Sequence, residues 1–118
     1  MKYMLLMFGS AGEMMATQPG DWVREMIDFM IAIDEELRAS GELVEARGLA
    51  DEARVVSLQD GQVVVSDGPY AESKEALAGY WVLDVASEER VVEIAGRIAR
   101  WSGRVELRRV ADGPPDID

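Results

Sequence analysis

A short run in the middle of the chain, from Ser66 to Glu75, brings side chains of several chemical types close together. It holds the carboxylate of Asp67, the phenol of Tyr70 and the amine of Lys74 between two segments with strand-like composition. The glycine after Asp67 permits a positive φ, and the proline that follows fixes the next φ and removes a backbone donor. The aspartate is therefore held still, as catalysis and recognition both require, although the same tripeptide also serves merely to close a turn.

Asp67 and Lys74 are the predicted catalytic residues. A carboxylate beside an apolar wall, such as the ring of Tyr70, is suited to act as a general base. An ammonium group close to that carboxylate favours its charged form, so an anion-binding cradle or a structural ion pair is the alternative to a proton shuttle. Tyr70 is predicted to contact the substrate from the same turn.

Glu36, Arg47 and Tyr80 are predicted to bind substrate from other parts of the chain. Glu36 and Asp34 lie at opposite edges of the apolar stripe of one predicted helix, where carboxylates either face a cleft or stay solvated. Arg47 can bind a substrate anion or form a cross-strand ion pair. Tyr80 and Trp81 point to opposite faces of one strand, so at most one of them lines a given pocket.

The composition of the 118-residue chain excludes several kinds of chemistry. It has no histidine and no cysteine, so proton transfer depends on Asp, Glu, Lys or Tyr, and thiolate chemistry is excluded. Twelve Lys and Arg against 23 Asp and Glu give a net charge of −11, which argues against nucleic acid and membrane partners because both are anionic. The sequence lacks phosphate-loop, zinc-site and dinucleotide motifs, so we expect neither a metal nor a cofactor. The apolar run at residues 3–8 is too short for a signal peptide or a membrane span, and a cytoplasmic location is expected.

Hydropathy patterns predict the strands and helices that must position these side chains. Apolar residues in alternating or continuous runs indicate strands at 2–8, 43–49, 54–58, 63–66, 78–85 and 104–110. Apolar residues at helical spacing indicate one helix from Trp22 to near Gly41, and a second helix that Ser87 caps and Gly103 ends. Residues 9–20 are expected to form a loop and residues 72–77 a short helical turn. An Asp-Gly turn joins the strands at 54–58 and 63–66 into a hairpin.

The order of these elements predicts an α+β domain over residues 1–111, followed by a tail at 112–118. Strand, helix, strand, hairpin, strand, helix and strand is a ferredoxin-like order, which places both helices on one face of an antiparallel sheet. The other face then has no cover within the chain, although the strands at 2–8 and 78–85 are apolar on both sides. We therefore expect two copies to pack their sheets face to face in a homodimer.

Three segments of the chain together match one family signature. The central segment consists of Asp67-Gly68-Pro69-Tyr70-Ala71-Glu72-Ser73-Lys74-Glu75 with Leu77 and Gly79-Tyr80-Trp81. The others are Met1 to Leu6 and the stretch from Glu35-Glu36-Leu37 to Gly48-Leu49. This pattern resembles the YCII-related proteins, in particular their DGPF branch. The resemblance implies a dimeric α+β barrel, and it covers nearly the whole chain.

The same resemblance implies roles for individual residues. The aspartate, phenylalanine and lysine of the family motif fall on Asp67, Tyr70 and Lys74, and its glutamate–leucine pair falls on Glu36 and Leu37. Some relatives in the wider superfamily resemble isomerases or dehalogenating enzymes that act on oxidised aromatic rings, and some DGPF proteins are associated with alternative sigma factors. Other YCII branches are thought to pair a histidine with an aspartate, which this chain cannot do because it lacks histidine.

Three functional hypotheses follow from the sequence. The first is a dimeric, cofactor-free protein with a pocket between the sheet and the first helix, where Asp67 and Lys74 bind or protonate a small oxygenated molecule during isomerisation or elimination. The second is a non-enzymatic binding or regulatory module whose acidic surface engages a basic partner, such as a sigma-like transcription factor. The third is a scaffold whose dimer surface is its only function.

Overall fold

A four-stranded antiparallel sheet forms the centre of the computed structural model, which describes residues 1–9, 11–68 and 76–115. Its central strands are β1 (Lys2–Phe8) and β5 (Leu77–Asp84), and its edge strands are β2 (Leu43–Gly48) and β6 (Glu106–Arg109). All neighbouring strands are antiparallel. The strand order β2-β5-β1-β6 is the ferredoxin-like one, so the predicted α+β fold is confirmed.

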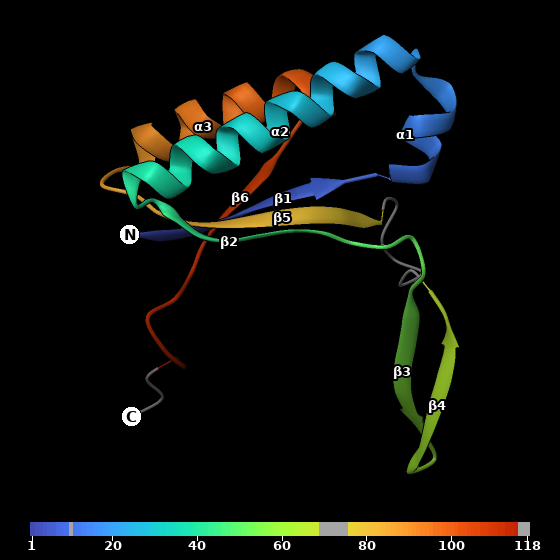
Figure 1. Cartoon of the computed structure of the whole chain (residues 1–118). Helices are drawn as coiled ribbons and strands as arrows, with labels where there is room; N and C mark the ends of the chain where they lie inside the picture. Colours follow the sequence, from blue (N-terminus) through green and yellow to red (C-terminus); the bar gives the residue numbers. More distant parts are fainter. Residues whose placement is uncertain (10, 69–75, 116–118) are drawn as a thin grey trace.

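Two long helices, α2 (Gly20–Ser40) and α3 (Glu88–Ser102), lie on the same face of the sheet (Figure 1). The side chain of Ser87 accepts a hydrogen bond from the backbone N–H of Arg90 at 3.2 Å, as expected of an N-cap. Gly41 and Gly103 each end a helix with a φ of 84°, a conformation that side chains disfavour. Both predicted helices are therefore confirmed. Among the described residues, no helix combines the length and apolar character that crossing a bilayer requires.

The core lies between this helical layer and the inner face of the sheet. Alternation along the central strands turns Leu5 and Trp81 inward as neighbours across β1 and β5. The side chains that are fully buried come from both layers: Leu5, Ile33, Leu37, Leu83, Val91, Ile94 and Ile98. Truncating any of them would leave a cavity in close-packed material, so this cluster fixes the relative position of sheet and helices.

The outer face of the sheet is also apolar at its centre. Met4 pairs with Val82, and Leu6 pairs with Tyr80, on the side that points away from α2 and α3. These side chains are only partly buried, and Figure 1 shows no helix on this side of the sheet. The described part of the chain thus leaves an apolar sheet face without a covering layer.

The prediction of a loop over residues 9–20 is wrong, because the structure has a helix there. The short helix α1 (Ala11–Thr17) consists mainly of good helix formers, and the hydroxyl of Thr17 donates to the carbonyl of Glu13 at 2.9 Å. Pro19 then precedes the first residue of α2, which begins at Gly20 and not at Trp22. Pro19 is the N-cap residue of α2, with an extended ψ of 145° and no side-chain cap hydrogen bond.

The predicted hairpin is confirmed, but it does not join the main sheet. β3 (Arg54–Gln59) and β4 (Gln62–Asp67) form a separate two-stranded sheet around a turn in which Asp60 and Gly61 have φ values of 52° and 78°. Figure 1 shows this hairpin extending from the end of the main sheet, toward the side opposite α2 and α3. The helical turn predicted at 72–77 lies mostly outside the described residues, and Leu77 already belongs to β5.

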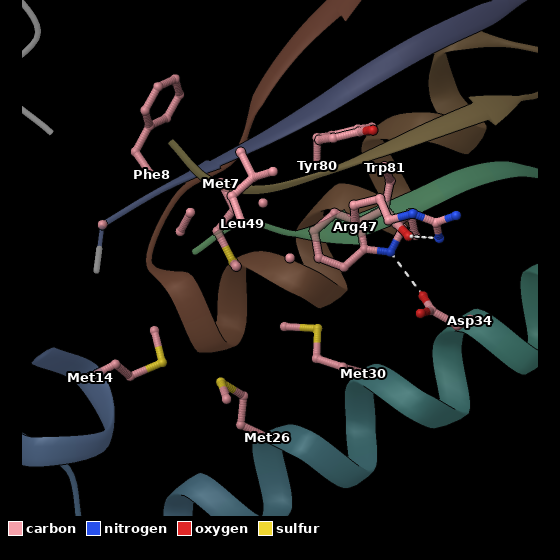
Figure 2. A pocket seen from close by; sticks show the side chains of 15 residues that line it. Met7, Phe8, Met14, Met26, Met30, Asp34, Arg47, Leu49, Tyr80 and Trp81 are labelled. Carbon is pink, nitrogen blue, oxygen red and sulfur yellow. Dashed lines mark hydrogen bonds between the residues drawn. The ribbon is translucent and has the colours of Figure 1, made fainter. Parts of the chain in front are cut away.

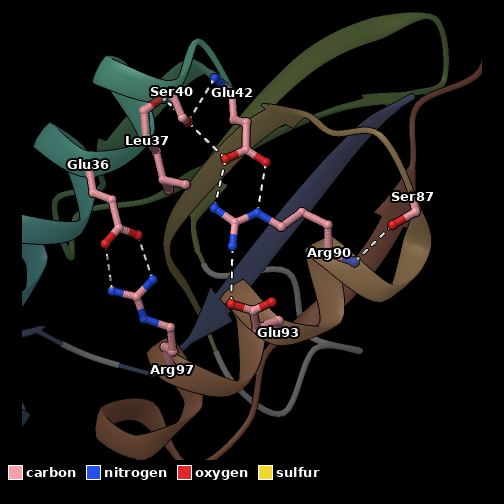
Figure 3. Close-up of polar contacts among 8 residues, drawn as sticks. All are labelled: Glu36, Leu37, Ser40, Glu42, Ser87, Arg90, Glu93 and Arg97. Atoms are coloured by element: carbon pink, nitrogen blue, oxygen red, sulfur yellow. Dashed lines mark hydrogen bonds and ion pairs between the residues drawn. The ribbon is translucent and has the colours of Figure 1, made fainter.

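A bidentate ion pair ties α3 to the connection between α2 and β2 (Figure 3). Arg90 donates from Nε to Glu42 Oε2 at 2.9 Å and from Nη2 to Oε1 at 2.8 Å. The hydroxyl of Ser40 also donates to Oε1 at 2.8 Å. These hydrogen bonds, that of Arg90 first, hold the pKa of Glu42 below its usual value of 4.5. Because the Glu42 side chain is only 16% exposed, this pair is less screened than most surface ion pairs.

Replacing Glu42 by glutamine should lower the free energy of unfolding at pH 7 by about 1–3 kcal/mol, because charge-assisted hydrogen bonds to Arg90 are lost. A folded pKa below the unfolded one stabilises the fold above the unfolded value of 4.5, and this contribution disappears as the pH falls through the folded pKa. Urea unfolding should therefore show a difference between wild type and Glu42→Gln that is full above pH 4.5 and closes as the pH falls through the lowered pKa of Glu42.

The matched control is Glu36→Gln, which removes a carboxylate from a similar pair on a more exposed site. Arg97 Nη1 lies 2.6 Å from Glu36 Oε2, but the Glu36 side chain is 49% exposed. Glu36→Gln should therefore change stability less than Glu42→Gln does. A Glu42→Gln effect that persists unchanged in acid would contradict the electrostatic account of this contact.

Candidate functional site

A cavity of about 270 Å³ opens between the inner face of the sheet, α1 and α2 (Figure 2). It lies where the sequence placed a pocket, between the sheet and the first long helix. Its described lining is mainly apolar and consists of Met7, Phe8, Gly9, Met14, Met26, Met30, Asp34, Ala46, Arg47, Gly48, Leu49, Ala78, Gly79, Tyr80 and Trp81. A mostly apolar hollow with few polar groups is typical of a small-molecule site.

Two paired glycines account for the hollow. Gly48 on β2 pairs with Gly79 on β5, and alternation places both on the same face as Ala46 and Trp81. A Cβ at Gly79 would lie 2.9 Å from the carbonyl oxygen of Arg47, so the backbones approach closely there. A Cβ at Gly48 would meet no atom within 4 Å. The missing side chains therefore leave space that larger residues would fill.

Four methionines form much of the cavity wall. Met7 comes from β1, Met14 from α1, and Met26 and Met30 from α2. Figure 2 shows their thioether ends directed toward the same central space. Methionine side chains are flexible and polarizable, and they make favourable contacts with aromatic rings. This wall can therefore accommodate the apolar part of a ligand that is flat or irregular in shape.

Asp34 supplies the carboxylate among the described lining residues. The indole Nε1–H of Trp81 donates to Asp34 Oδ1 at 2.9 Å (Figure 2). Asp34 is half-buried on α2, and Trp81 is buried on β5. Its second oxygen, Oδ2, accepts no hydrogen bond from the described residues. The carboxylate is thus oriented by one oxygen and available through the other.

Glu36, the helix carboxylate preferred at the sequence level, points elsewhere. It accepts hydrogen bonds from Arg97 Nη1 at 2.6 Å and from Nη2 at 3.3 Å, on the surface between α2 and α3 (Figure 3). The hydrogen bond from Arg97 is the main reason that the pKa of Glu36 is lowered. Glu36 does not line the described cavity, and its geometry is that of an interhelical ion pair.

Arg47 and Tyr80 border the cavity from the edge where β2 meets β5. They pair with each other, and alternation places both side chains on the outer face of the sheet, opposite Asp34 and Trp81. Arg47 Nη1 donates to the carbonyl of Ala46 at 2.9 Å, and the Arg47 side chain is 67% exposed. The two predicted binding residues thus lie together, but not on the face that the cavity occupies.

Asp67 ends β4 at the root of the hairpin. Its side chain is 92% exposed, and its Oδ1 lies 3.4 Å from Arg54 Nη1. It does not contribute to the described cavity lining. Tyr70 and Lys74, predicted to act with it, lie outside the described residues. Asp67, the predicted catalytic carboxylate, therefore lies outside the described cavity.

Asp34 lines the cavity, although the sequence favoured Glu36 on the same helix. The available signal was its position at the edge of an apolar stripe, which Glu36 shared. Asp34 and Trp81 are 47 positions apart, so only the folded chain joins the carboxylate to its donor. Among residues 1–9, 11–68 and 76–115, no group of three or more acidic side chains is placed to hold a metal ion.

Comparisons with known proteins show which family the chain belongs to. An uncharacterized protein of Rhizobium meliloti (strain 1021) is 35% identical over 54 residues, which is 43% of this chain and 44% of that protein. The alignment therefore spans less than half of either protein. The model of the YCII-related domain matches residues 1–113, nearly the full length of the sequence. With this match over the sheet, the helices and the cavity alike, the chain belongs to the YCII-related domain family.

Proposed function

We propose that the chain is an enzyme that moves a proton on a small oxygenated molecule held in the methionine-walled cavity. The observation that supports this most strongly is the half-buried Asp34 carboxylate, with Oδ1 held by Trp81 and Oδ2 free of partners in the described part of the chain. A general base needs such a combination of fixed position and open acceptor. In a chain without histidine, proton transfer depends on Asp, Glu, Lys or Tyr, and Asp34 is the carboxylate among the described lining residues.

The proposed reaction is an isomerisation or elimination by proton transfer. Asp34 Oδ2 takes a proton from a carbon next to a carbonyl group, and the electron pair of the broken C–H bond moves toward the carbonyl oxygen. In an isomerisation the same carboxyl group returns the proton to another carbon. In an elimination the electron pair forms a new C=C bond, the leaving group on the neighbouring carbon departs with the electron pair of its own bond, and the proton stays on Asp34. Neither the isomerisation nor the elimination needs a redox partner, because neither reaction is a net oxidation or reduction.

The cavity supports a substrate of modest size with an apolar body. The walls offer thioethers and the indole of Trp81, which favour contact with an unsaturated ring. The volume of about 270 Å³ is at the small end of ligand sites. Cyclic enones and unsaturated lactones fit this description, since they combine a flat body with an acidic carbon-bound proton.

We propose the DGPF branch as the finer assignment within the family, on the strength of the run Asp67-Gly68-Pro69-Tyr70. That branch makes Asp67 and Lys74 the rival catalytic pair. Arg47, Tyr80, Glu36 and Tyr70 remain predicted binding residues under the same hypothesis. The two hypotheses differ in which aspartate the reaction requires.

We also propose that the protein acts as a homodimer, with the apolar outer faces of two sheets packed together. Met4, Leu6, Tyr80 and Val82 support this because they form an uncovered apolar patch at the centre of the sheet. Sheets that pack face to face bury such side chains between them. Dimerisation would then also cover the bordering residues Arg47 and Tyr80.

The test begins with a thermal-shift screen of cyclic enones and unsaturated lactones, since a bound ligand raises the melting temperature. Compounds that stabilise the protein are then incubated with it in D₂O, and proton NMR follows replacement of their carbon-bound hydrogen. The proposal predicts exchange catalysed by wild type and by Asp67→Asn. Binding without any catalysed exchange would contradict the enzymatic function.

A second candidate, favoured by the net charge of −11, is a binding module for a basic protein. A sigma-like transcription factor is the partner proposed for it. Such a complex should weaken steeply as salt is added, because it depends on charge attraction. Salt-sensitive capture of a basic protein, together with no catalysed exchange, would favour this function over the enzymatic one.

A further inference from the structure

The β3–β4 hairpin has an exposed apolar face. Val56 pairs with Val65 and Leu58 pairs with Val63 across the two strands, so all four side chains lie on one face. Their exposed fractions are 66%, 60%, 72% and 67%, in that order. We call these four residues the hairpin patch. Isolated exposed valines are ordinary, but two adjacent cross-strand pairs form a continuous apolar surface.

The hairpin is not stabilised by a third strand. β3 and β4 pair only with each other, and the described residues add no strand to either edge. A two-stranded hairpin in water is marginally stable at best and needs packing against another layer. Near the root of the hairpin, the backbone N–H of Gly68 donates to the carbonyl of Ala53 at 3.0 Å. The hairpin patch lies nearer the other end and is exposed.

The direction of the hairpin indicates what covers it. In Figure 1 the helices lie on one side of the main sheet, and the hairpin extends toward the other side. That is the side where Met4, Leu6, Tyr80 and Val82 form the uncovered apolar patch. A second sheet packed on this face would occupy the space beside the hairpin.

We infer that the hairpin is a clasp, whose apolar patch packs against a second copy of this chain. The inference rests on the proposed homodimer and adds to it a second contact on each protomer. In a twofold dimer both hairpins would reach across, so one symmetric assembly covers both sheet faces and both hairpin patches.

The distribution of charge also favours a second copy of the chain as the partner of the hairpin patch. A chain with a net charge of −11 repels its own copies where acidic groups meet. The hairpin patch carries no charge, and its flanking residues Gln59 and Gln62 are neutral, as is the centre of the outer sheet face; Asp60 adds one charge at the turn. Contact between copies through these surfaces therefore avoids much of the repulsion that other surfaces would create.

The test compares two valine-to-threonine variants. The double change Val56→Thr with Val65→Thr keeps shape and strand propensity but places hydroxyls on the hairpin patch. The control is Val92→Thr, which changes a 52% exposed valine on α3. Sedimentation equilibrium gives the dimer dissociation constant of each protein, and amide hydrogen exchange reports protection within β3 and β4.

We expect the double variant to weaken the dimer by on the order of 100-fold, because four hydroxyls per dimer would be buried without ideal partners. Val92→Thr should leave the dissociation constant unchanged. Hairpin amides should exchange slowly in the dimer and quickly after dilution to the monomer. A dimer that the double variant leaves intact, with hairpin amides exchanging quickly throughout, would overturn the clasp and leave the sheet-to-sheet dimer standing. A wild-type chain that stays monomeric at high concentration would overturn both.

Discussion

Replacing Asp34 by asparagine should lower the rate of proton exchange on a bound substrate by about 10²- to 10⁴-fold. The amide oxygen of asparagine can still accept the hydrogen bond from Trp81, which holds the side chain at 2.9 Å in the wild type. The amide cannot take up a proton as a carboxylate does. Ligand affinity and melting temperature should therefore change little while catalysis is lost. The measurement is deuterium incorporation by NMR at matched saturation.

Two further variants separate this effect from simple loss of structure. Trp81→Phe removes the donor but keeps an aromatic ring, so exchange should fall less than with Asp34→Asn because the base remains but is poorly oriented. Asp67→Asn alters a carboxylate that is 92% exposed and outside the described cavity lining, and should leave exchange unchanged. Loss of exchange in Asp67→Asn but not in Asp34→Asn would transfer the catalytic role to the motif aspartate.

Filling the cavity from Gly48 should strongly weaken ligand binding and leave the fold intact. A valine at this position would project from β2 into space where a Cβ meets no atom within 4 Å. Valine also favours strands and reduces the entropy of the unfolded chain, so the free energy of unfolding should rise by about 0.4–1 kcal/mol. The side chain competes with ligand for the same volume, and affinity should fall by about 100-fold or more. Calorimetric titration and urea unfolding measure the two effects.

Gly79→Ala is the matched comparison, because it adds a smaller group to the glycine that pairs with Gly48. Its Cβ would lie 2.9 Å from the carbonyl oxygen of Arg47, and the backbone would have to move. We expect a loss of about 1–3 kcal/mol in unfolding free energy. A Gly48→Val protein that binds ligand as well as wild type would show that the ligand occupies another part of the molecule.

Much of the fold was predictable because its signals are local. Ser87 caps the start of α3 and Gly103 caps its end, and both caps can be recognised from the residue type. The Asp60-Gly61 pair specifies the tight turn of the hairpin. The helix α1 was missed because its seven residues carry no long periodic pattern, so a short run of helix-forming residues looked like part of a loop.

The site was harder to predict because it depends on contacts between distant segments. Asp34 and Glu36 occupy opposite edges of one apolar stripe, and only the folded chain shows that α3 lies beside the Glu36 edge and the cavity beside the Asp34 edge. The pairing of Gly48 with Gly79 depends on a register that shifts at an irregularity earlier in β2. Residue spacing predicts neither the place of Asp34 in the cavity nor the pairing of Gly48 with Gly79. The motif around Asp67, in contrast, is a continuous run that is easily recognised in the sequence.

The most direct test of the cavity is the nitrogen-15 spectrum of the tryptophan indoles during titration with the compound that most stabilises the wild type. The chain has three tryptophans, and Trp22 and Trp101 contact each other at a ring separation of 5.4 Å beside a different hollow. Each indole is assigned from the spectrum of its phenylalanine variant. The account predicts that the Trp81 indole resonance shifts on binding while those of Trp22 and Trp101 stay in place. Saturation of binding with an unmoved Trp81 resonance would contradict it.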